Sequence, residues 1–241
     1  MFAKRILFVK NTKIEGPGLL AKLVLERRIS YDIIELDNGA HLPHSINYSG
    51  VVVLGGPDSA NDSTSKMANE VNWVKKITDL GVPYLGICLG MQVLVKATGG
   101  QVTKNPVKEI GWKDPEGNPF QVELTQLGLT DPLFANMEHT LPIFHLHGET
   151  VVLEPGMVLL ATGKHCTNQV VKVGKSAYGI QGHFEIDEAS YEILIAQDAD
   201  LKNMDIFALK NDYERAREAY MRVGRMLFGN FLNIIENEEK K

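Results

Sequence analysis

The segment Gly86-Ile87-Cys88-Leu89-Gly90 constrains the fold of this chain more than any other stretch. An apolar run at 82–85 precedes it, and a helical pattern at 91–96 follows it. A cysteine between two glycines at a strand-to-helix junction is the cysteine form of the nucleophile elbow, in which glycines let the backbone pack closely around a strained turn. Because the sulfur would lie at the start of a helix, the helix dipole is expected to favour the thiolate.

The alternative role for Cys88 is the usual one for a cysteine, that of a small buried hydrophobic residue. The two glycines, the preceding strand and the following helix favour the catalytic role, which requires a base elsewhere in the chain. Cys166, the other cysteine, lacks such surroundings and is expected to be structural. Two cysteines argue against a disulfide framework, so we expect a cytoplasmic location.

Apolar runs and helical patterns alternate through the first hundred residues. Strands are expected at 5–9, 31–36, 50–56 and 83–87, and helices at 19–28, 65–80 and 91–96. Continuous apolar runs are typical of strands buried on both faces, and this order of elements indicates a parallel sheet covered by helices. Ser63, Thr64 and Ser65 are candidate N-caps of the second helix.

After Gly99-Gly100 the pattern changes to short strand-like pieces separated by turn residues. These pieces lie at 101–103, 107–112, 120–124, 141–146, 157–162, 169–173 and 177–181, and helical patterns return at 188–197 and 212–236. The predicted fold class is α/β, with a mainly parallel central sheet flanked by helices and a small antiparallel β addition. We expect a single domain over 1–241, with a catalytic core at about 4–198 and a C-terminal helical extension at about 199–237.

The 241 residues carry a formal net charge of −5, and the basic residues do not cluster. Nucleic-acid binders show a basic patch, so no nucleic-acid partner is expected. No apolar run approaches the ~18 residues of a membrane helix, and the N-terminus has no signal-peptide pattern, so no membrane partner is expected. The chain shows no Walker-type phosphate loop, and we expect neither a cofactor nor a metal ion.

His183 and Glu185 follow the apolar run at 177–181. Residues two apart in an extended segment point to the same face, so Glu185 can hold one imidazole nitrogen while the other faces a nucleophile. Taken alone, the pair is also explained by a surface or core histidine. Active sites of such sheets form beyond the carboxyl ends of the strands, so in a chain with an elbow we predict a base and its orienting group.

Gly55-Gly56-Pro57 follows another buried run. Two glycines there would let backbone N–H groups approach a reacting centre, and an oxyanion hole needs such a donor together with the N–H of the residue after the nucleophile, Leu89. An ordinary tight turn is the alternative.

Together with Lys108-Glu109-Ile110-Gly111-Trp112 and His145-Leu146-His147-Gly148-Glu149, these segments resemble the class I (triad) glutamine amidotransferases. The resemblance runs from about residue 50 to 186 and is strongest to stand-alone proteins labelled GMP-synthase-like amidotransferases. It implies a flavodoxin-like core and an enzyme that hydrolyses the side-chain amide of glutamine, releasing glutamate and ammonia. In that family the cysteine attacks the amide, so the resemblance makes Cys88 the nucleophile, His183 its base and Glu185 the group that orients the base.

The resemblance also implies roles for the residues around this triad. The N–H groups of Gly56 and Leu89 would hold the oxyanion of the intermediate. Gln92, His147 and Gly55 fall where the family contacts or shapes the glutamine pocket. Glutamine or another γ-glutamyl small molecule is the expected ligand, and a synthase subunit that accepts ammonia is a candidate partner.

Two departures from the family pattern leave other functions open. The family commonly has Phe-His-Pro-Glu where this chain has Gly182-His183-Phe184-Glu185, so the loss of proline is expected to change the turn and Gly182 to open space beside His183. Gln-Gly-His also occurs in γ-glutamyl peptidase relatives, and we recognise no synthetase domain, so a stand-alone γ-glutamyl hydrolase or peptidase is one alternative. A catalytically idle regulatory module that binds a partner is another, against which the intact triad argues.

Overall fold

A computed structural model of the chain describes residues 5–238, which form one large sheet, one small sheet and flanking helices. Across the large sheet the strands are, in order, β2 (Ser30–Glu35), β1 (Arg5–Lys10), β3 (Gly50–Val53), β4 (Tyr84–Ile87), β11 (Ala177–Ile180), β10 (Val170–Val173), β9 (Met157–Gly163), β6 (Gln121–Leu124) and β7 (Thr140–Pro142). The small sheet pairs β5 (Gln101–Gly111) with β8 (His145–Val152) in antiparallel fashion.

The large sheet is parallel from β2 to β11 and antiparallel from β11 to β7. The neighbouring strands β3, β4 and β11 are apolar and buried along their whole length, as strands with helices on both faces must be. Gly86 of β4 pairs with Val53 on one side and with Gly179 on the other. This register brings the carboxyl ends of the three strands to one edge of the sheet.

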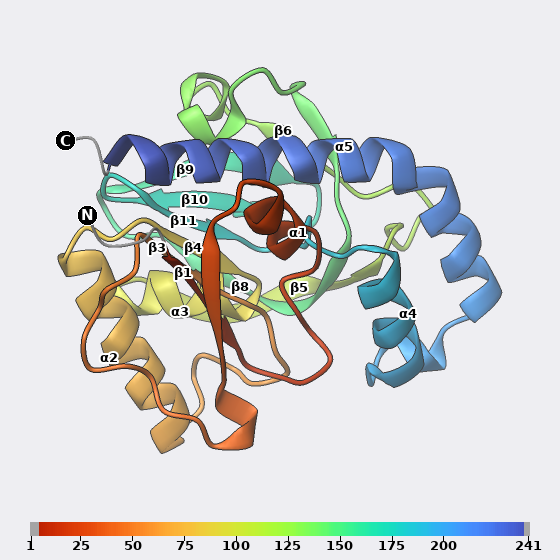
Figure 1. The fold of residues 1–241 in the computed structure, drawn as a ribbon. Coiled ribbons are helices and arrows are strands. Elements are labelled where there is room, and N and C mark those ends of the chain that lie inside the picture. Colours follow the sequence, from red (N-terminus) through yellow and green to blue (C-terminus); the bar gives the residue numbers. More distant parts are fainter. Residues whose placement is uncertain (1–4, 239–241) are drawn as a thin grey trace.

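The helices are divided between the two faces of the sheet (Figure 1). They are α1 (Gly18–Glu26), α2 (Ser65–Asp79), α3 (Leu89–Ala97), α4 (Glu188–Gln197) and α5 (Ile206–Glu238), with short 3-10 turns at Leu36–Asn38, Gly128–Thr130, Pro132–Phe134 and Leu201–Asn203. A hydrophobic core lies on each face of the sheet, and alternate residues of β1 belong to different cores. Ile6 and Phe8 pack with α1 and α5, whereas Leu7 and Val9 pack with α2 and α3. This is the period-two pattern of a strand buried on both faces.

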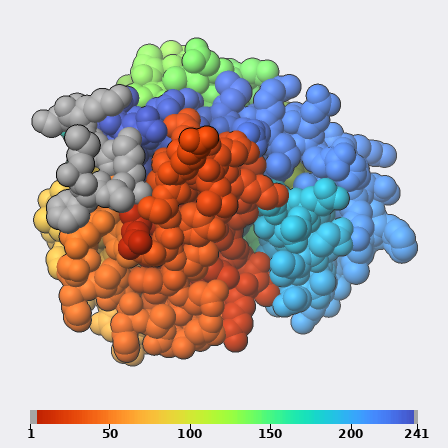
Figure 2. Space-filling model, in the orientation of Figure 1, coloured from red at the N-terminus to blue at the C-terminus, as the bar shows by residue number. Residues whose placement is uncertain are grey.

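The start of α4 lies against α1, and the two are adjacent on the face shown in Figure 2. Asp187 caps α4 by accepting from the Ser190 N–H at 2.9 Å, and it also pairs with Lys22 Nζ of α1 at 2.6 Å. Within residues 5–238, no helix is both long and apolar enough to cross a bilayer.

The predicted α/β class is confirmed, and the N-cap of α2 is Thr64, whose hydroxyl accepts from the Met67 N–H. Three expectations from the sequence were wrong in detail. The pieces at 101–103 and 107–112 form one strand, β5, whose register shifts between Lys104 and Glu109. The piece at 141–146 belongs to two strands, because Phe144 between them pairs with His183 instead. Helix α5 begins six residues earlier than predicted, because Asp205 accepts from N–H groups of its first turn. The division of the chain near residue 198 stays a prediction.

Candidate active site

Cys88 occupies a strained turn between β4 and α3, with φ of 51° and ψ of −107°. Non-glycine residues adopt positive φ rarely, and such strain is typical of functional turns. A Cβ on Gly90 would overlap the carbonyl oxygen of Val53, and a Cβ on Gly86 would overlap the backbone of Gly90. The flanking glycines are therefore required by the close approach of β3, β4 and α3, which is the packing that an elbow demands.

His183 and Glu185 follow β11, the strand next to β4, and form a buried pair. His183 Nδ1 lies 2.6 Å from Glu185 Oε1. The Phe184 N–H donates to Glu185 Oε2 at 3.0 Å, which fixes the carboxylate. The other ring nitrogen of His183 has no in-line hydrogen-bond partner within residues 5–238, and the Cys88 thiol interacts with this imidazole.

Two helices hold the segment that carries this pair. At the start of α1, the Leu19 N–H donates to the carbonyl oxygen of Glu185 at 2.8 Å. On α5, the Tyr220 hydroxyl accepts from the Ile186 N–H at 3.2 Å. A Cβ on Gly224 of α5 would lie 2.5 Å from the carbonyl oxygen of Phe184, so α5 lies directly against this segment.

Burial and charge shift the proton affinities of the cysteine and the histidine. Burial raises the pKa of the Cys88 thiol, and the hydrogen bond and charge of His183 only partly offset this. Burial alone would lower the pKa of His183, but the Glu185 carboxylate and the Cys88 side chain raise it well above 6.5. The N–H of Leu89 at the helix start lowers the pKa of Cys88, in the direction expected from the sequence, but desolvation is the larger effect and the net shift is upward. The charged form of each group depends on the other, so the two titrate as a pair.

Cys88 faces a cleft of about 560 Å³ at the carboxyl edge of the sheet. Four other predicted residues, Gly56, Leu89, Gln92 and His147, also line the cleft. Leu89 is the first residue of α3, where N–H groups have no partner within the helix, and its N–H interacts with the Cys88 sulfur.

Gly55, His183 and Glu185 are buried and do not line the cleft. A Cβ on Gly55 would lie 3.4 Å from the Cβ of Cys88, so this glycine lies next to Cys88. His147, by contrast, reaches the cleft but turns its ring nitrogens to protein groups, with Nε2 2.9 Å from Glu109 Oε2 and Nδ1 3.0 Å from the carbonyl oxygen of Glu149. Its ring therefore shapes the wall.

The expectation that Gly182 opens space beside His183 is wrong. A Cβ on Gly182 would lie 2.6 Å from Ile143 Cδ1 and 2.7 Å from His145 Nδ1. These side chains fill the space, so glycine is needed for packing. The residue that replaces the family's proline, Phe184, supplies the N–H that holds Glu185, and a proline could not donate it.

Sequence reasoning missed two residues beside Cys88. The Gln181 side-chain amide donates to Cys88 Sγ at 3.9 Å. Glu15, after β1, lines the cleft, and burial raises its pKa to about 7. The signal for Gln181 was its place two residues before His183, in the segment already selected for the His183–Glu185 pair. The only signal for Glu15 was its place beyond the carboxyl end of a predicted strand.

A buried group beside the cleft, Glu109, His147 and Cys166, has atoms close enough to bind a metal ion. Protein groups already satisfy it, because the Gln169 side chain donates to Glu109 Oε2 at 3.1 Å and the Thr150 hydroxyl lies 3.1 Å from Cys166 Sγ. Burial raises the pKa of Cys166 to about 11, which disfavours the thiolate that a metal requires.

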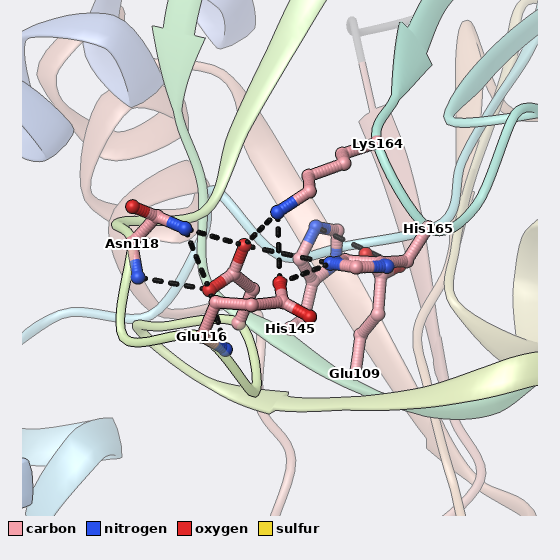
Figure 3. A network of polar contacts seen from close by, with 7 residues as sticks. Glu109, Glu116, Asn118, His145, Lys164 and His165 are labelled. Atoms are coloured by element: carbon pink, nitrogen blue, oxygen red, sulfur yellow. Dashed lines mark hydrogen bonds and ion pairs between the residues drawn. The ribbon is translucent and has the colours of Figure 1, made fainter.

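A second group, Asp114, Glu116 and His165, surrounds the Lys164 ammonium (Figure 3). Lys164 Nζ lies 2.8 Å from a carboxylate oxygen of both Asp114 and Glu116, and Asp114 also accepts from the Asn118 N–H. Lys164 lowers the pKa of Asp114 and supplies the cation of this cluster. The cluster therefore ties the turn at 114–118 to the segment after β9.

Comparisons with known proteins place the chain among amidotransferases. The family model "Glutamine amidotransferase class-I" matches residues 18–198. A glutamine amidotransferase-like protein of Salmonella typhimurium, YfeJ, is 28% identical over 197 residues, which cover 79% of this chain and 80% of that protein. The glutamine-hydrolysing GMP synthase of Bacillus subtilis is 33% identical over 150 residues, 61% of this chain but 26% of the synthase, so the match spans about a quarter of that longer protein. The crystal structure of a Thermotoga maritima glutamine amidotransferase superposes with a TM-score of 0.84 at 26% identity, covering 96% of this chain and 99% of that one.

Proposed function

Because this chain belongs to the class I glutamine amidotransferase family, we propose that it hydrolyses the side-chain amide of glutamine through a γ-glutamyl thioester on Cys88. The observation that carries the proposal is the meeting of three side chains at the ends of two neighbouring strands. Cys88 stands in a strained turn after β4, and His183 stands after β11 with its Nδ1 2.6 Å from Glu185. A nucleophile, a base and a group that orients the base are the parts that covalent catalysis requires.

In the first half of the reaction, Cys88 attacks the amide carbon while its proton passes to His183. The oxyanion that forms would accept hydrogen bonds from the N–H groups of Gly56 and Leu89, whose residues line the cleft beside the sulfur. The C–N bond then breaks, and the nitrogen takes the proton from His183 and leaves as ammonia. Glu185 stabilises the imidazolium that exists between these steps.

In the second half, a water molecule gives a proton to His183 and attacks the thioester carbon. The C–S bond breaks, the sulfur recovers the proton, and glutamate leaves. Gln92 and His147 would form the wall that receives the γ-glutamyl group, since both line the same cleft as Cys88. Gly55 would let the backbone of this wall lie close to the nucleophile.

Two versions of this function differ in the fate of the ammonia, which either passes to a synthase partner or is simply released. A synthase partner that accepts ammonia is supported by the glutamine-hydrolysing GMP synthase, of which this chain matches about a quarter. The absence of a fused synthase domain, which a stand-alone γ-glutamyl hydrolase would share, is a feature of the Thermotoga structure, of which this chain covers 99%, and this chain covers 80% of YfeJ.

The test is glutamate release by the purified chain, measured for glutamine, γ-glutamyl dipeptides, γ-glutamyl amines and glutathione conjugates. Cys88→Ala and His183→Ala are expected to reduce release to background, and the double variant to be no worse than either, because nucleophile and base act as a unit. The matched control is Cys166→Ala, which removes the cysteine outside the cleft and should retain turnover. Unchanged glutamate release by Cys88→Ala would overturn the proposal, and the preferred substrate separates its two versions.

A further inference from the structure

Glu15 is a half-buried residue of the cleft wall, and the reaction above gives it no role. Its Oε2 atom is buried and has no hydrogen-bond partner within residues 5–238. Burial raises the pKa of this carboxyl group to about 7. Buried polar groups in native proteins are nearly always paired, so an unpaired carboxyl oxygen in the wall of a cleft points to a ligand that pairs with it.

The position of Glu15 relative to the triad indicates which part of a ligand it would meet. A Cβ on Gly55 would overlap Glu15 Oε2 and would also lie 3.4 Å from the Cβ of Cys88, so only a glycine separates the carboxyl group from the nucleophile. The charges that act on the Glu15 carboxyl group are those of His183, Glu185 and Asp198. The segment that follows Glu15 contacts the segment that carries His183, because the Leu19 N–H donates to the Glu185 carbonyl oxygen at 2.8 Å and Gly18 lies directly against the same oxygen. Glu15 therefore lies near the histidine from which the leaving nitrogen receives its proton.

Within residues 5–238, no lysine or arginine forms an ion pair with this carboxyl group. Among the described residues, the cleft wall contains one lysine, Lys108, and its Nζ is bonded to both carboxylate oxygens of Asp200 at 2.7 Å. Lys66, close by on α2, is bonded to Asp58 at 2.6 Å. A bound substrate that carries an N–H can therefore supply the donor that Glu15 lacks.

We propose that Glu15 binds the leaving nitrogen of the substrate and positions it for proton transfer from His183, an inference that rests on the amide hydrolysis proposed above. In the tetrahedral intermediate, the nitrogen accepts a proton from His183 and donates an N–H hydrogen bond to Glu15 Oε2. The carboxylate stabilises the positive charge on this nitrogen until the C–N bond breaks and ammonia leaves. Glu15 forms no covalent bond, and the ligand class it recognises is a γ-glutamyl amide that carries an N–H.

The test compares glutamine with the γ-methyl ester of glutamate, whose leaving oxygen carries no hydrogen and cannot donate to Glu15. Glu15→Gln and Glu15→Ala are expected to lower kcat for glutamine by about 10- to 100-fold, the usual effect of losing a hydrogen bond to a charged group. Both variants should change kcat for the ester by less than about threefold. The ester also serves as the control for folding, because it requires the same Cys88 and His183. Asp200→Asn is the matched control, since it removes a cleft carboxylate that already has a cation partner.

Three results would count against the inference, and they are distinguishable. Equal losses for amide and ester in the Glu15 variants would overturn the role of Glu15 and leave the proposed function standing. A selective loss for glutamine in Asp200→Asn would assign the effect to the charge of the cleft and overturn the role of Glu15. Failure of the wild-type chain to hydrolyse either substrate would overturn the proposed function together with the inference.

Discussion

Replacing Glu70 by glutamine is expected to stabilise the protein at pH 8 much more than at pH 5. Glu70 lies on α2 and is fully buried. The Asn11 side chain donates to Glu70 Oε1 at 2.9 Å, but Glu70 Oε2 has no hydrogen-bond partner in the described part of the chain. Burial raises the pKa of Glu70 from 4.5 to about 7, against the opposing effects of Asn11 and Lys66.

The sign and size of the effect follow from proton linkage. A carboxyl group whose pKa is raised by folding binds its proton more tightly in the folded state, so its contribution to stability is complete below pH 4.5 and is lost as the pH rises to about 7. The difference between these two pKa values corresponds to about 3 kcal/mol, most of which is lost between pH 5 and pH 8. Glutamine does not ionise, so Glu70→Gln escapes this loss.

The assay is urea denaturation of the wild type and Glu70→Gln at both pH values, with free energies of unfolding obtained by linear extrapolation. Subtracting the wild type from the variant at each pH cancels the other groups that titrate. Asp79→Asn is the control on the same helix, because its solvated ion pair with Lys75 contributes little to stability. A relative gain for Glu70→Gln below about 0.5 kcal/mol between pH 5 and pH 8, or a gain at pH 5 instead, would refute the reasoning.

Three further outcomes are expected around the elbow, each measured by thermal unfolding. Gly90→Ala should lower the free energy of unfolding by about 1–3 kcal/mol because the new Cβ would overlap the Val53 carbonyl oxygen, and an unchanged Tm would contradict this packing. Cys88→Gly should unfold at a higher temperature than Cys88→Ala, by roughly 1 kcal/mol of stability, because glycine adopts positive φ freely; the reverse order would show that the turn is not strained. Tyr84→Phe should cost about 1 kcal/mol because it removes the hydroxyl that donates to the Gly90 carbonyl oxygen at 2.8 Å, and equal stability would show that this bond contributes nothing.

The parallel half of the fold could be predicted because its strands are buried on both faces and so appear as unbroken apolar runs. Val51, Val52 and Val53 are such a run, and each is fully buried. The small sheet could not be predicted as well, because β5 alternates buried and exposed residues and changes register midway. Such a shift depends on the partner strand, which lies more than 30 residues away in the sequence.

The family resemblance is confirmed, whereas the roles of individual site residues stay predictions that the geometry supports. Cys88, His183 and Glu185 could be selected because each belongs to a short segment that is recognisable by itself. Cys88 lies between two glycines, and His183 and Glu185 lie two residues apart after an apolar run. The protonation of Cys88 could not be predicted, because desolvation depends on everything packed around the sulfur. Glu15 was missed for the same reason, since its burial beside Gly55 arises only when β1 and β3 are paired in the sheet.

Helix α5 contacts the segment that follows β11 and carries His183. The region that matches the family model ends at residue 198, so α5 lies outside it. On α5, the Tyr220 hydroxyl accepts from the Ile186 N–H, and Gly224 packs against the Phe184 carbonyl oxygen. The backbone on either side of Glu185 is therefore packed against a helix from the C-terminal end of the chain, whereas Cys88 lies between β4 and α3. A side chain larger than glycine at position 224 would press on this backbone without lining the cleft.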